Sequence, residues 1–95
     1  MPNLATELKS DFMTINITVK LFAAYQEAYG KSELSLDLPA PLTVNDLLAK
    51  LVSEKPELTQ WQEVTRFGVN LDFVDPETLL NDGDVVVFIP PVNGG

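Results

Sequence analysis

Apolar and polar residues alternate in two segments of the first half of the chain, residues 15–21 and residues 32–38. A period of two sends successive side chains to opposite faces, so both segments are predicted to be strands with one buried face. We expect the two strands to pair in antiparallel fashion. The sequence Pro39-Ala40-Pro41 is expected to end the second strand, because proline cannot donate to a sheet ladder.

The sequence also predicts two helices. Residues 22–29 are rich in alanine and aromatic residues, and Gly30 is a suitable C-cap for a short helix. Apolar side chains recur at helical spacing within residues 44–55, which predicts the main helix of the chain. Thr43 before it and Asp46 three residues later fit a capping box. The apolar stripe of this helix is expected to pack on a sheet.

The second half of the chain is predicted to supply three more strands. Residues 67–71 alternate, and residues 73–74 can return as a short strand. Residues 75–80 indicate a turn with a helical half-turn, and the sequence Asn-Asp-Gly-Asp at 81–84 is a strong turn signal. Residues 85–89 are all apolar, so both faces of this strand should avoid water. That composition favours a central place in the sheet.

These elements predict an α+β domain in which a mixed sheet wraps one main helix. The domain is expected to span residues 14–89. Residues 1–13 form an N-terminal appendage for which a short helix or disorder is expected, and residues 90–95 form an extended tail. Trp61, in the connector after the main helix, is expected to anchor the core or its rim.

One sheet face should remain uncovered, because a single helix covers only the other. Part of that face is expected to form an apolar docking patch for a partner. Two sets of side chains on the last strand could supply it: either Val85, Val87 and Ile89, or Val86 and Phe88.

The tail has features that suit chemistry at the chain end. Pro90 and Pro91 stop sheet pairing and favour an extended backbone, so residues 90–95 can reach about 20 Å. Gly94 and Gly95 present a narrow backbone and an unhindered carboxylate. A carboxylate is a poor electrophile and needs activation, for example by transfer of AMP from ATP. The chain has neither a GxxxxGK[ST] nor a GxGxxG loop, so a second protein is expected to supply that step.

Composition narrows the function further. The 95 residues carry a formal net charge of -8, which argues against nucleic acid and favours partners with basic surfaces. Cysteine and histidine are absent, so thiolate nucleophiles, Cys-His pairs and the usual zinc sites are excluded. An autonomous enzyme is therefore not expected. No apolar run approaches the ~20 residues of a membrane span and no export signal is recognisable, so a cytoplasmic location without membrane attachment is expected.

Several short motifs together point to a family. They are Val-Lys-Leu-Phe-Ala at 19–23, Thr-Val at 43–44, Val-Asn at 69–70, Asp-Gly-Asp at 82–84, and Phe-Ile-Pro-Pro-Val-Asn-Gly-Gly at 88–95. With them the chain resembles the ubiquitin-like β-grasp sulfur carriers, most closely the small subunit of molybdopterin synthase. The resemblance runs from about Ile15 to Gly95. Asn93 departs from it, since a small residue is common at that position.

The resemblance implies a division of labour between proteins. An adenylating enzyme related to the ubiquitin activators would use ATP to activate Gly95, and a sulfur donor would convert the adenylate to a thiocarboxylate. The large subunit of molybdopterin synthase would then receive the tail, and sulfur would pass to a pterin precursor in molybdenum cofactor biosynthesis. The chain itself would bind no metal or cofactor. Its contact residues would be Phe88 for docking and Pro90, Pro91, Val92, Asn93 and Gly94 in the partner's tunnel.

Three alternatives stay open at this point. The chain could carry sulfur for thiamine or amino-acid synthesis, act as a ubiquitin-like modifier, or serve as a β-grasp interaction module whose Gly-Gly end is incidental. The tail lacks the arginine that precedes Gly-Gly in protein-modifying ubiquitins, which argues against the modifier. The interaction module predicts that deleting Gly95 changes nothing.

Overall fold

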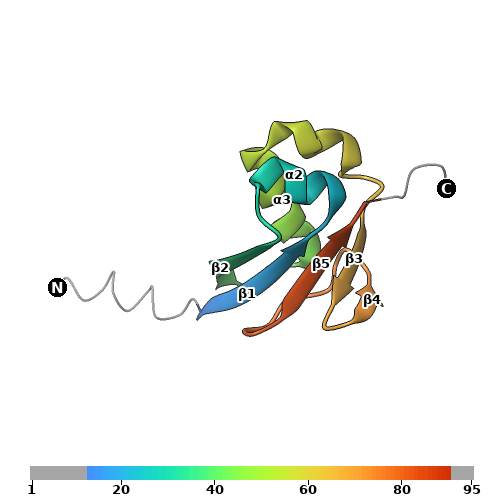
Figure 1. The fold of residues 1–95 in the computed structure, drawn as a ribbon. Helices are drawn as coiled ribbons and strands as arrows, with labels where there is room; N and C mark the ends of the chain where they lie inside the picture. The colour runs from blue at the N-terminus through green and yellow to red at the C-terminus, as the bar shows by residue number, and fades with distance from the viewer. Residues whose placement is uncertain (1–12, 91–95) are drawn as a thin grey trace.

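The computed structural model describes residues 13–90, which form a five-stranded mixed sheet with the order β2-β1-β5-β3-β4. Three helical segments lie on one face of this sheet (Figure 1). The predicted α+β class is confirmed, because one mixed sheet wraps around helices that all pack on the same face. The strands are β1 (Met13–Leu21), β2 (Glu33–Ala40), β3 (Arg66–Val69), β4 (Asp72–Val74) and β5 (Val85–Ile89), and the helices are α2 (Ala23–Tyr29), α3 (Val44–Glu54) and the 3-10 helix η1 (Pro56–Trp61).

The main helix, α3, begins at the predicted capping box. The backbone N–H of Asp46 donates to Thr43 Oγ1 over 3.0 Å, and the backbone N–H of Thr43 donates to Asp46 Oδ2 over 2.9 Å. Two otherwise unpaired N–H groups at the helix start are satisfied in this way. The apolar stripe packs on the sheet as predicted, and it consists of Val44, Leu47, Leu48, Leu51 and Val52. No helix within residues 13–90 is long and apolar enough to cross a membrane.

The short helix α2 ends at Gly30, as predicted. Gly30 has a φ of 68°, in the left-handed region, and its backbone N–H donates to the Gln26 carbonyl over 2.8 Å. Glycine adopts this conformation without a Cβ penalty, and this explains why the helix stops there.

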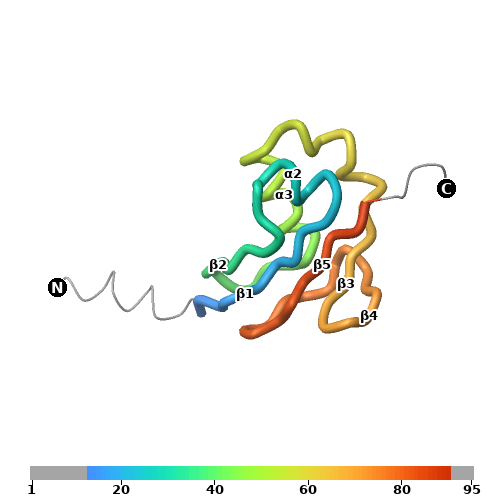
Figure 2. The backbone as a smooth tube through the Cα atoms, viewed as in Figure 1, coloured from blue at the N-terminus to red at the C-terminus, as the bar shows by residue number. Residues whose placement is uncertain are grey.

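The centre of the sheet is a parallel pair of strands from opposite ends of the described chain, β1 and β5. Their register runs from Thr18 opposite Val85 to Leu21 opposite Phe88. Figure 2 shows the two strands side by side between β2 and β3. The predicted central place of the last strand is confirmed. Burial on both faces accounts for its unbroken apolar sequence.

Both strands of the first pair are longer than predicted. Met13, assigned above to the N-terminal appendage, already pairs with Ala40. Pro39 does not end β2, because the strand continues to Ala40. β2 lies at the edge of the sheet and pairs only with β1, so a residue without an N–H can face its open side.

Two details of the second half differ from the prediction. The third strand ends at Val69, because Asn70 and Leu71 have φ values of 51° and 76° and form a tight turn into β4. Within residues 75–80 the predicted turn is present, with the Thr78 N–H donating to the Asp75 carbonyl over 3.0 Å, but it does not extend into a helix. The same segment also bonds to the start of α3: Val44 N–H donates to the Thr78 carbonyl over 2.9 Å, and Asn45 N–H to the Pro76 carbonyl over 3.1 Å.

Candidate docking face and tail exit

Sheet pairing ends at Ile89, which lies opposite Arg66 on β3. The prediction that the ladder stops before the two prolines is confirmed to this point. Pro90 is buried directly after β5. The other predicted tail residues lie outside the described part of the chain: Pro91, Val92, Asn93, Gly94 and Gly95. The structure therefore fixes the place from which the tail departs.

Phe88 was predicted to dock on a partner, and this prediction is wrong. Its side chain is 0% exposed. The ring centroid lies 5.7 Å from that of Tyr25 and 5.7 Å from that of Phe67, in an aromatic cluster beneath the helices. Val86 is also 0% exposed. Parallel pairing with β1 determines which side chains of β5 are buried. Val86 lies opposite Val19 and Phe88 lies opposite Leu21, so both share the buried face of β1.

The alternative set, Val85, Val87 and Ile89, occupies the face without helices and is partly exposed. This outcome settles which side of β5 can meet a partner. Next to it, a shallow hollow of about 180 Å³ opens over β3, β4 and β5. We call this surface the docking face, and its lining consists of Gly68, Leu71, Asp72, Phe73, Val87 and Ile89.

Two large apolar side chains stand out on the docking face. Phe73 is 73% exposed and Leu71 is fully exposed, at 101%. Gly68 lies opposite both Phe73 and Val87 in the sheet, and its lack of a side chain leaves the hollow open between them. Exposed apolar groups around a hollow are typical of a protein interaction site. Sequence reasoning missed Leu71, which it placed within a strand.

The turn that presents Leu71 is held by a network of hydrogen bonds around Asn70. Asn70 Nδ2 donates to Asp84 Oδ1 over 2.9 Å, and Val85 N–H donates to Asn70 Oδ1 over 2.9 Å. Asp84 is nearly buried and also accepts from the Asn81 N–H over 2.8 Å. The network ties the β3-β4 turn to the turn before β5. Leu71 is thereby kept at a positive φ, which costs a leucine about 1–2 kcal/mol.

The ionisable groups with altered pKa values lie on the helix side of the sheet. Burial raises the pKa of Tyr25, although its hydrogen bond with Thr65 lowers it in part. Burial and the hydrogen bond to Glu54 raise the pKa of Tyr29, and the same bond lowers the pKa of Glu54. Residues 13–90 contain no group of three acidic, histidine or cysteine side chains that could hold a metal ion.

The chain is similar in sequence to proteins of a known family. The model of the ThiS family matches residues 19–95. The molybdopterin synthase sulfur carrier subunit of Chlamydomonas reinhardtii is 34% identical over 83 residues, which is 85% of this chain and the whole of the relative.

Two solved structures with the same fold are a subunit of a molybdopterin-converting factor and a small archaeal modifier protein. Subunits 1 and 2 of the molybdopterin-converting factor of Helicobacter pylori form a complex whose matching chain has a TM-score of 0.59 and 27% identity, with 85% of this chain and 100% of that chain covered. The small archaeal modifier protein 1 of Methanosarcina acetivorans has a TM-score of 0.69 and 28% identity, with 87% and 99% covered. By the family match and the full-length relative together, this chain belongs to the ThiS family and is related to its molybdopterin synthase sulfur carrier subunits.

Proposed function

We propose that this chain is the sulfur carrier subunit of a molybdopterin synthase and that Gly95 carries the sulfur as a terminal thiocarboxylate. The observation that carries this proposal is the relative of that name, which is matched along its whole length. The family match also runs through Gly95, so it includes the Gly-Gly pair.

The proposed chemistry takes place at the carboxylate and uses no side chain of this protein. An adenylating enzyme would transfer AMP from ATP to the Gly95 carboxylate and release pyrophosphate. A sulfur nucleophile would then attack the acyl carbon, displace AMP and leave a thiocarboxylate. Because partner enzymes bind ATP and the sulfur donor, this chain would act as a carrier and would not turn over substrate on its own.

The docking face supports a two-part interaction with the large subunit. Ordering five or six tail residues in a tunnel costs about 1–2 kcal/mol of backbone entropy for each residue. The tail alone is therefore a weak anchor. Burial of large apolar side chains such as Phe73 and Leu71 contributes about 1.5–3 kcal/mol each. In the Helicobacter pylori complex the related subunit is joined to a second subunit, which makes a large subunit the partner of choice here.

Intact mass spectrometry tests the proposed chemistry. The chain is incubated with ATP, a cognate adenylating enzyme and a sulfide source, and we expect a mass gain equal to the exchange of one oxygen for sulfur. A variant without Gly95 should gain nothing. Addition of the large subunit and the pterin precursor should then consume the sulfur and form molybdopterin. Sulfur on an internal side chain, or molybdopterin formation by the shortened variant, would contradict the proposal.

A protein modifier is the second candidate, because a small archaeal modifier protein shares the fold. A modifier would form an isopeptide bond between Gly95 and a lysine of a target. Incubation with cell extract, ATP and the adenylating enzyme separates the two roles. Conjugates that depend on Gly95 would favour the modifier, whereas a free thiocarboxylate without conjugates favours the sulfur carrier.

A further inference from the structure

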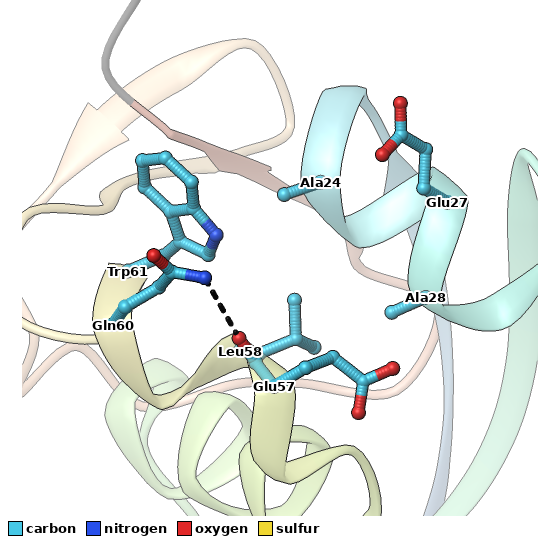
Figure 3. A pocket seen from close by; sticks show the side chains of 7 residues that line it. All are labelled: Ala24, Glu27, Ala28, Glu57, Leu58, Gln60 and Trp61. Atoms are coloured by element: carbon cyan, nitrogen blue, oxygen red, sulfur yellow. Dashed lines mark hydrogen bonds between the residues drawn. The ribbon is translucent and has the colours of Figure 1, made fainter.

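A second hollow, separate from the docking face, lies between α2 and η1 and has a volume of about 290 Å³ (Figure 3). We call it the tail-side hollow. Its size is at the lower limit of small-molecule sites, which span about 300–1,000 Å³, and it suits a single long side chain. Its walls are formed by Ala24, Glu27 and Ala28 of α2 and by Glu57, Leu58, Gln60 and Trp61 of η1.

The chemistry of the tail-side hollow is both apolar and acidic. The indole of Trp61 stands on one side, Ala24 and Ala28 stand on the other, and Leu58 lies between them (Figure 3). Leu58 is buried in the core, and Trp61 is only partly buried. The carboxylates of Glu27 and Glu57 belong to exposed residues at the rim.

Neither carboxylate forms an ion pair within 4.0 Å among residues 13–90. The ion pairs among residues 13–90 join Lys20 to Glu33 and Lys50 to Glu54. The Lys55 ammonium lies 5.3 Å from the centre of the Tyr29 ring instead. An aromatic wall with two free carboxylates attracts a cation that also has an apolar stem, because a guanidinium or ammonium group binds both an aromatic ring and a carboxylate.

The tail-side hollow lies at the end of the sheet from which the tail departs. Leu21 pairs with Phe88, and Ala24 follows it by three residues. Arg66 pairs with Ile89, and the neighbouring Thr65 donates through Oγ1 to the Trp61 carbonyl over 2.7 Å. Both walls are thus continuous with the strands that flank the last residues of β5. A protein that receives the tail would meet this hollow.

The two walls are also tied to each other. Tyr25 OH of α2 forms a hydrogen bond with Thr65 Oγ1, and the Thr65 hydroxyl in turn donates to the Trp61 carbonyl of η1. Burial raises the pKa of Tyr25, so its hydroxyl stays protonated and can keep this bond. Because the walls are held in place before binding, little ordering is needed when a side chain enters.

We propose that the tail-side hollow binds an arginine or lysine side chain of the large subunit while that subunit holds the tail. This inference rests on the proposed function and extends it with a second contact, on the helix side of the molecule. The docking face supplies apolar contact on the sheet side. The hollow would add charge complementarity, which governs association rate and partner choice.

Charge-reversal variants test the contact. We compare Glu27→Lys/Glu57→Lys with the matched control Asp75→Lys/Glu77→Lys, whose side chains are exposed and do not line the hollow. Both variants change the net charge equally. At low salt we expect the first to weaken binding to the large subunit at least about tenfold more than the control, and we expect added salt to reduce the difference. Trp61→Leu, with its fold checked by thermal melting, should also weaken binding more than the control.

Trp61 provides a direct readout, because it is the only tryptophan of the chain. In a 15N-labelled sample its indole N–H gives one signal, which should shift when unlabelled large subunit is added. Equal affinities of the two charge-reversal variants, or an unshifted indole signal in the complex, would overturn the inference. If the wild-type chain acquires sulfur and binds the large subunit but either of these results is found, this inference alone fails. If the wild-type chain neither acquires sulfur nor binds the large subunit, both the proposed function and this inference are wrong.

Discussion

Gly68 on β3 lies directly opposite Val87 on β5, at the base of the hollow on the docking face. A Cβ added at Gly68 would meet the Val87 Cβ at 3.8 Å and the Asp72 carbonyl oxygen at 3.7 Å. Both are ordinary van der Waals distances. The fold therefore does not need glycine at this position, and the open space above Gly68 is available for contact with a partner.

Substitution of Gly68 should separate stability from binding. Gly68→Ala is expected to stabilise the fold by about 0.5–1 kcal/mol, because glycine loses more backbone entropy within a strand. Gly68→Leu should fill the hollow and weaken large-subunit binding, with a stability change below about 1 kcal/mol. Urea unfolding and isothermal titration calorimetry measure the two effects. Unchanged affinity of the leucine variant would mean that the partner does not use the hollow.

Phe88 and Phe73 should respond in opposite ways, because one is in the core and the other is exposed. Phe88→Ala removes a ring that contacts Tyr25 and Phe67, and it should destabilise the domain by about 3–5 kcal/mol. Phe73→Ser should change stability by no more than about 0.5 kcal/mol and weaken binding to the large subunit. Denaturant unfolding and calorimetry on both variants test this. A stable Phe88→Ala variant with impaired binding would restore the docking role that the structure denies to Phe88.

The sequence alone predicted the position of β5 in the sheet but not which of its two faces is buried. Five consecutive apolar residues predicted a central strand, and the order β1-β5-β3 confirms it. The same run has no polar residue to set its phase, so either Phe88 or Ile89 could have faced the helices. Pairing with β1 decides between them, and this contact spans nearly the whole described chain. Alternation in β1 was readable because polar residues there mark the outer face.

Local signals were the most reliable part of the sequence. The capping box of Thr43 and Asp46, the C-cap at Gly30 and the turn at Gly83 depend on backbone geometry within a few residues. The turn at Leu71 was not predicted, because leucine is rarely found at positive φ and the hydrogen bonds that hold the turn join Asn70 to the distant residues Asp84 and Val85. The tail-side hollow was also not predicted, since α2 and η1 are far apart in sequence.

Tyr29 and Glu54 should make stability depend on pH in the acid range. Tyr29 OH donates to Glu54 Oε1 over 2.8 Å, and this bond, followed by that from Lys50, lowers the Glu54 pKa from its ordinary value of 4.5. A carboxyl group with a lowered folded pKa adds stability above its unfolded pKa, and this is lost as the pH falls through the folded value.

Tyr29→Phe should therefore reduce the free energy of unfolding at neutral pH. Because Glu54 is largely exposed to solvent, the loss should be about 0.5–1 kcal/mol. At strongly acid pH the protonated Glu54 contributes little, so the variant and the wild type should become more nearly equal. Urea unfolding at both pH values tests this, with Glu54→Gln and the double variant as controls. A loss of the same size at both pH values would show that the hydroxyl acts through the Leu51 carbonyl, which lies 3.2 Å away and does not titrate, and not through the carboxylate.

Leu71 should show a trade between stability and binding. Its φ of 76° is unfavourable for a leucine, and its full exposure means that the side chain gains nothing from burial in the free chain. Leu71→Gly and Leu71→Asn, which tolerate positive φ, should raise the free energy of unfolding by up to about 1 kcal/mol. Both should weaken binding to the large subunit, because an apolar contact of the docking face is lost.

Denaturant unfolding and calorimetry on the same samples are needed, with Val64→Asn as a control for loss of an exposed apolar side chain elsewhere. If both Leu71 variants are more stable and bind equally well, the strained turn has no part in docking. A gain in stability with a loss of affinity would instead explain why the Asn70 network holds a leucine in this conformation.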